Sequence, residues 1–193
     1  MKSHHVLIQY LQSKTEICDS IIFEVLEKFI SISKKKKEIL VNKGDICTHI
    51  FFLVTGITRN FYIDINGLEY TRLITYQSKF FNNFLSFQKQ KPSRETIECL
   101  ENTELLGIAK SDFYYLISKH PQLFKLFTYE VVEYHNFHLE KLEFLSLLTP
   151  KEKLEYLWNH EQELIKRVSN AVLASYMGVK QETCSRLKKE IFK

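Results

Sequence analysis

The chain has 193 residues, of which 45% are hydrophobic and 26% charged, and it carries a net charge of +4. This composition is typical of a globular protein, and its 5 Gly and 3 Pro exclude collagen-like, linker-rich and low-complexity chains. No apolar run reaches the roughly 18 residues of a membrane span, and the N-terminal residues lack the pattern of a secretory signal. We therefore expect a cytoplasmic protein without a membrane segment.

The basic excess is concentrated at the C-terminal end. From Lys166 onward, seven Lys and Arg residues stand against two Glu, which leaves a net +5 there and −1 in the first 165 residues. Four cysteines, at positions 18, 47, 99 and 184, are far apart and form no C-x-x-C pair. We expect all four to be buried thiols and predict no metal site.

The first half of the chain changes from a helical to a strand pattern. Apolar residues three and four apart predict one amphipathic helix over 6–31, and Lys34 to Lys37 is expected to form a loop before the first strand. Residues 38–108 consist of short strands separated by turns, including a hairpin at Asn66-Gly67. This spacing predicts an antiparallel sandwich or barrel. Residues 78–92 interrupt it with a short helix and a loop.

The second half is predicted to be helical. A helix begins at Ser111-Asp112 with a capping signal, and a long helix runs from Pro121 to about residue 147 without Gly or Pro. Its apolar stripe indicates packing against a second copy of the chain, or a spine between domains. Thr149-Pro150 begins a further single helix.

The last 25 residues predict a helix-turn-helix. Two short helices that cross steeply need a small residue, a reversing Gly and apolar core positions, which Ala174, Gly178 and the neighbouring residues provide. Ser169 can cap the first helix. The core set is Leu173, Met177, Val179, Cys184 and Leu187.

The outer face of the second helix has the chemistry of a DNA reader. Gln pairs with adenine, Arg with guanine, Glu with the cytosine amino group, and Lys neutralises phosphate. The residues concerned are Lys180, Gln181, Glu182, Ser185, Arg186 and Lys189. The alternative is an ordinary helical hairpin with a solvated charged face.

The order of the β region, the long helix and the terminal helix pair resembles the bacterial Crp/Fnr transcriptional regulators, as does the run Gln181 to Arg186 after Gly178. The resemblance implies an α+β fold: an antiparallel β-roll (jelly roll) over 1–118, a dimerisation helix over 119–147 and an all-α helix-turn-helix over 148–193. It adds Ser169 and Thr183 as residues near phosphates. It also implies a homodimer on a palindromic double-stranded operator, with RNA polymerase as a candidate partner.

Three departures from the family pattern are visible. Lys180 replaces the usual capping Ser, and Val172 stands where many members have Glu. The sequence ends soon after the second helix, so we expect no β-hairpin wing.

The ligand pocket of the family is also altered. Nucleotide binders have Gly-Glu before a short helix and an Arg-Ser or Arg-Thr pair, whereas this chain offers only Asn82, Asn83, Ser93 and Arg94, and the acidic Glu95 follows Arg94. We expect a degenerate pocket, with binding of cAMP or another cyclic nucleotide as the alternative. The lone Cys18 speaks against an N-terminal iron–sulfur cluster. His135 and His138 are expected to be ordinary helix residues, with haem ligation as the alternative.

The sequence therefore predicts a non-enzymatic, sequence-specific DNA-binding regulator with no assured cofactor. The alternative is a cyclic-nucleotide sensing module whose C-terminal helices bind protein instead of DNA. No nucleophile–base pairing, phosphate loop or metal motif indicates an enzyme.

Overall fold

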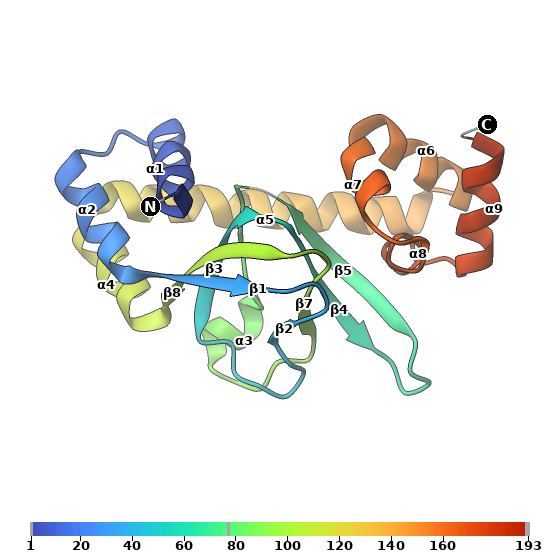
Figure 1. Cartoon of the computed structure of the whole chain (residues 1–193), viewed down its shortest axis with the longest axis horizontal. Coiled ribbons are helices and arrows are strands. Elements are labelled where there is room, and N and C mark those ends of the chain that lie inside the picture. The colour runs from blue at the N-terminus through green and yellow to red at the C-terminus, as the bar shows by residue number, and fades with distance from the viewer. Residues whose placement is uncertain (1, 77, 192–193) are drawn as a thin grey trace. The chain divides into compact units, whose positions relative to one another are not determined.

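The computed structural model describes residues 2–76 and 78–191, which form two compact units (Figure 1). The first unit contains Met1–Phe61 and Ile74–Val132, and the second contains Tyr62–Leu73 and Glu133–Lys193. Among the described residues, no helix is both long enough and apolar enough to cross a membrane.

The first unit is built on two four-stranded sheets. One joins β1 (Phe29–Lys34), β8 (Thr103–Ala109), β3 (His49–Thr55) and β6 (Phe80–Phe81), in that order. The other joins β2 (Ile39–Val41), β7 (Thr96–Cys99), β4 (Ile57–Ile63) and β5 (Glu69–Tyr76). The neighbouring strands pair antiparallel in β1·β8, β3·β8, β2·β7 and β4·β7, which confirms the predicted β-roll.

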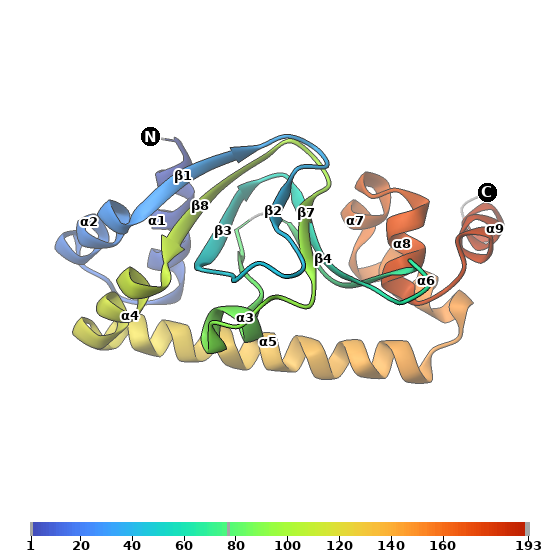
Figure 2. The same cartoon turned by 90° about the horizontal axis from the view of Figure 1, so that it is seen from below.

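Helices close one end of this roll. Figure 2 shows α1 (Lys2–Lys14), α2 (Asp19–Lys28) and α4 (Lys110–Lys119) beside the start of α5 (Pro121–Leu147). Their apolar faces and the first sheet share one buried cluster, which includes Leu7, Val25, Phe52, Leu106 and Leu123. The short helix α3 (Phe84–Lys89) lies in the region where a helix and a loop were expected.

The single helix predicted over 6–31 is wrong. Residues 15–18 separate α1 from α2, and the chain leaves the helix at Phe29 to pair with Ile108 of β8. The apolar residues of β1 fit a helical period, but a pairing with residues over 70 positions away decides their structure. The lysine run accordingly begins at the last residue of the first strand, Lys34, and Lys35 to Lys37 follow that strand instead of preceding it.

The second unit contains the end of the β4–β5 hairpin and the C-terminal helices. After α5 come α6 (Pro150–His160), α7 (Gln162–Arg167), α8 (Asn170–Met177) and α9 (Gln181–Ile191). Thr149 begins α6 through a reciprocal capping box with Glu152. One helix was predicted where α6 and α7 are separate, since the chain breaks at Glu161.

Two smaller expectations are also wrong. The N-cap of α4 is Ala109, so the Ser111-Asp112 pair lies inside the helix, where Asp112 forms an ion pair with Lys28. Cys18 is exposed, whereas the other three cysteines are buried as expected. Burial raises the pKa of each of those three thiols, Cys47, Cys99 and Cys184.

Candidate nucleic-acid interface

The two helices α8 and α9 form the predicted helix-turn-helix. Ser169 caps α8, because its hydroxyl accepts a hydrogen bond of 3.2 Å from the amide of Val172. Gly178 ends α8 in the left-handed conformation, with φ 67°, and its amide donates to the carbonyl of Ala174. A left-handed residue at this position reverses the chain, and glycine adopts it without a Cβ penalty.

The apolar residues predicted for the core of the motif pack as expected. Leu173, Met177, Cys184 and Leu187 are buried, and Val179 is half-buried. The core is sealed by α6, which contributes the buried Leu154 and Leu157. This packing leaves the opposite face of α9 to solvent.

The solvent face of α9 carries the three predicted base readers. Gln181, Glu182 and Arg186 are exposed, and so are the flanking Lys180 and Lys189. Within residues 2–76 and 78–191, none of these five side chains forms a hydrogen bond or ion pair with the protein. Their polar groups are therefore available to a partner. Lys193, which contributes to the basic segment, lies outside the described residues.

Other predicted contacts are partly engaged inside the motif. The side-chain nitrogen Nδ2 of Asn170 donates a 3.3 Å hydrogen bond to the Ser185 hydroxyl. The side-chain oxygen Oδ1 of Asn170 accepts a 3.0 Å hydrogen bond from Lys188. Thr183 is half-buried. Asn170 thus ties the start of α8 to α9. These roles of Asn170 and Lys188 could not be predicted from the sequence, because neither residue belongs to a recognisable motif.

Comparisons with known proteins agree with this geometry. Residues 32–120 match the family model of the cyclic nucleotide-binding domain. FixK2 from Bradyrhizobium japonicum is 15% identical with a TM-score of 0.75, covering 85% of this chain and 84% of that one. The c-di-GMP responsive global regulator CLP of Xanthomonas campestris is 14% identical, with a TM-score of 0.73 over 91% of this chain and 92% of that one.

A third structure carries the family name. It is a putative transcriptional regulator of the Crp/Fnr family from Eubacterium rectale, 17% identical with a TM-score of 0.70, covering 91% of this chain and 84% of that one. This chain has the Crp/Fnr fold. No curated protein matches its sequence.

The Crp/Fnr fold implies a cyclic nucleotide in the roll, but the residues present do not fit an anion. One of the first amides of α3, that of Ser86, is not free, because it donates a hydrogen bond to the Asn83 side chain. The Asn83 amide group in turn donates to the Ser93 hydroxyl. Asn83 and Ser93 are therefore bonded to each other in a buried cluster, and the backbone carbonyl of the buried Asn82 accepts a hydrogen bond from the side chain of Asn60.

The fourth predicted ligand residue, Arg94, is separated from this cluster. It is exposed, whereas Glu95 is only 3% exposed. Although Glu95 follows Arg94 in the sequence, Arg94 forms no ion pair with it or with any other group among the described residues. Glu95 lies instead 3.4 Å from the amide nitrogen of the buried Asn60. A carboxylate at this position opposes a cyclic phosphate.

We expect cAMP to leave the thermal midpoint unchanged. A ligand that binds only the folded protein would stabilise it by about 2.7 kcal/mol at 100 times its Kd. Differential scanning fluorimetry with increasing cAMP or cGMP measures this, and Arg94→Ala is the matched control. A midpoint that rises with nucleotide in the starting protein but not in Arg94→Ala would contradict the degenerate pocket.

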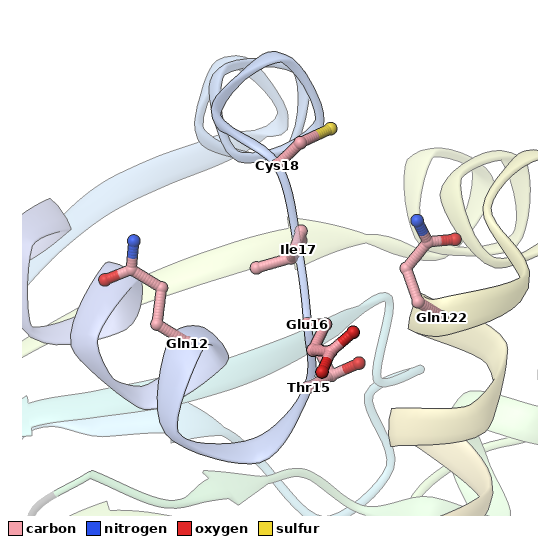
Figure 3. A pocket seen from close by; sticks show the side chains of 6 residues that line it. All are labelled: Gln12, Thr15, Glu16, Ile17, Cys18 and Gln122. Carbon is pink, nitrogen blue, oxygen red and sulfur yellow. The ribbon is translucent and has the colours of Figure 1, made fainter.

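Figure 3 shows residues that line an open depression elsewhere in the first unit. Its volume is about 640 Å³. It is lined by side chains from α1, the α1–α2 connection and α5, among them Gln12, Glu16 and Gln122. None of the four candidate ligand residues lines it, and its only charged side chain is acidic. It therefore has no anion-binding character.

One of the two histidines considered as haem ligands, His138, is bonded within the chain. His138 Nε2 lies 3.0 Å from a guanidinium nitrogen of Arg72, and Arg has no acceptor, so this ring nitrogen is the acceptor. Burial and the neighbouring charge lower the pKa of His138 to about 4. Among the described residues, no three His, Cys, Asp or Glu side chains are grouped as a metal site.

Proposed function

We propose that this protein is a sequence-specific DNA-binding transcription regulator. The observation that carries the proposal is the face of α9, where Gln181, Glu182 and Arg186 are exposed on a helix-turn-helix without protein partners. A recognition helix needs free donors and acceptors of this kind to reach base edges. Two of the solved structures of similar fold are named as regulators of gene expression or of transcription, which supports the same function.

We further propose that the protein binds DNA as a homodimer through α5. Val132, Leu139 and Leu142 are each about half exposed, at 50%, 48% and 61%. Their spacing of seven and three residues places them on one face of the helix. A second copy would cover these side chains and present a second α9 to a palindromic operator. Val131 and Tyr134, two further apolar positions of α5, are half-buried within the chain.

Selection of bound sequences from random double-stranded DNA tests the proposal. The affinity for the selected site should fall with added salt, because each phosphate contact releases counterions. We expect Arg186→Ala to weaken binding to the selected site about tenfold to a hundredfold and to relax base preference at one position, since a base contact contributes about 1–3 kcal/mol. Fluorescence anisotropy at several salt concentrations measures both effects.

A charge-matched control separates base reading from general attraction. Lys166 lies on α7 and forms an ion pair with Glu163, so Lys166→Ala removes one positive charge away from α9. It should leave base preference unchanged. If Arg186→Ala and Gln181→Ala both bind the selected site as the starting protein does, α9 does not read DNA. Binding of protein by the C-terminal helices would then become the leading hypothesis.

A further inference from the structure

Helix α8 is bonded to the end of the β4–β5 hairpin by one side chain. The Ser175 hydroxyl accepts a hydrogen bond of 2.8 Å from the amide of Thr71 and lies 2.9 Å from the Thr71 hydroxyl. It donates to the carbonyl of Glu69 at 2.9 Å. A serine hydroxyl has one donor and two acceptor sites, and these three bonds use all of them.

The next residue of β5 attaches the same hairpin end to α5. One guanidinium nitrogen of Arg72 lies 2.8 Å from the Tyr134 hydroxyl and 3.0 Å from His138 Nε2. His138 can accept this bond because its low pKa, about 4, keeps the ring neutral at physiological pH. Residues 69–72 therefore hold two helices at once. We call Glu69, Thr71, Arg72 and Ser175 the hairpin latch.

Both ends of α8 have further fixed contacts. Near its end, the carbonyl of Tyr176 accepts a 2.7 Å hydrogen bond from Lys141 of α5. At its start, Asn170 bonds Ser185 and Lys188 of α9. Helix α8 is thus bonded both to the β4–β5 hairpin, through Ser175, and to α9, through Asn170, so that a shift of α8 would move α9.

We propose that Ser175 is a positioning residue for the recognition helix, through the hairpin latch. Strands β4 and β5 run without interruption from the roll to the hairpin end, so the chain itself connects this latch to the sensor strands. The latch leaves the exposed face of α9 uncovered, so it orients the helix instead of masking it. This inference rests on the proposed DNA-binding function.

Ser175→Ala removes the latch bonds with the smallest change of shape. In the full chain, we expect faster amide hydrogen exchange at Thr71, and throughout α8 and α9, because backbone groups lose their partner and the helices gain freedom. We expect affinity for the selected DNA site to fall about tenfold, with base preference unchanged. Ser175→Thr keeps the hydroxyl and should restore both exchange and affinity.

Two controls make the result decisive. Ser118→Ala removes a hydroxyl that bonds only the carbonyl of Tyr115 in its own helix, and should change neither exchange nor affinity. Thr71→Val removes one latch bond from the opposite partner and should give a smaller effect in the same direction. Circular dichroism of each variant establishes that it is folded.

The outcomes distinguish the latch from the DNA proposal. If Ser175→Ala exchanges like the starting protein in α8 and α9, or exchanges faster but binds the selected site equally well, Ser175 is not a positioning residue. If no DNA sequence is selected at all, the proposed function fails. Exchange in α9 still decides in that case whether the latch orders this helix.

Discussion

Replacing Gly56 by Ala should lower the free energy of unfolding of the first unit by about 2–6 kcal/mol. Gly56 lies between β3 and β4 with φ +100°, a conformation that costs other residues about 1–3 kcal/mol. A Cβ there would lie 2.6 Å from the Thr103 hydroxyl oxygen and 2.9 Å from the carbonyl oxygen of Asn102. The turn must move against backbone, which adds an overpacking cost of about 1–3 kcal/mol.

Gly44 provides a matched control for this substitution. Its φ of +98° is nearly the same, yet nothing lies within 4 Å of a Cβ built on it. Gly44→Ala therefore reports the conformational strain alone, and the difference between the two variants reports the clash. Calorimetry on both variants measures this difference. Equal destabilisation by the two substitutions would show that the turn relaxes freely around a methyl group.

Replacing Lys141 by Met should stabilise the second unit and flatten its dependence on pH. Lys141 is 7% exposed, and burial, with Lys153 nearby, lowers its pKa to about 6. The ring faces of Phe144 and Tyr176 favour the ammonium form by about 0.5–2 kcal/mol. Removing an unpaired charge from water costs several kcal/mol, which is more than the rings contribute. Burial therefore decides the direction of the pKa shift, and the neutral amine is favoured.

The sign of the pH effect follows from proton counting. Between about pH 6 and 10 the unfolded chain binds a proton at Lys141 that the folded protein lacks, so stability rises with pH across this range. At pH 8 this cost is about 3 kcal/mol, from about 1.4 kcal/mol per pH unit. Loss of the bond to Tyr176 offsets about 1 kcal/mol of it. We expect Lys141→Met to gain about 1–3 kcal/mol.

Trp158, the one tryptophan of the chain, lies in α6 and reports unfolding of the second unit. Urea titrations followed by its fluorescence at pH 6.5 and 8 give the two stabilities. The control is Lys151→Met, at an exposed lysine of α6, which should change the free energy of unfolding little. If Lys141→Met is instead less stable at both pH values, Lys141 is charged in the folded protein and the ring faces stabilise it.

The parts of the fold that local residues determine could be predicted from the sequence. Gly178, the Ser169 cap and the spacing of the apolar residues around them all lie within one short segment. These local signals are sufficient to predict α8 and α9. The boundary at Phe29 could not be predicted in this way, because β1 depends on pairing with β8. The break between α1 and α2 could not be predicted either, because neither Gly nor Pro marks it in the sequence.

The candidate site also contains residues that could be predicted from the sequence and residues that could not. The exposed positions of α9 could be inferred from helical periodicity and charge. Ser175 could not, because it bonds residues over 100 positions away and resembles any other helical serine. The burial of Lys141 also has no local signal, since lysine at a helix surface is usually solvated.

The bonds of Ser175 have one consequence for association of the protein with itself. β5 is the last strand in its sheet, so the amide of Thr71 and the carbonyl of Glu69 would otherwise form an open edge. Open strand edges are templates for pairing with other chains. The turn between β4 and β5, next to this edge, also exposes the apolar side chains of Ile65 and Leu68. By placing a helical hydroxyl on that edge, the fold covers part of an exposed strand edge with its own helix-turn-helix.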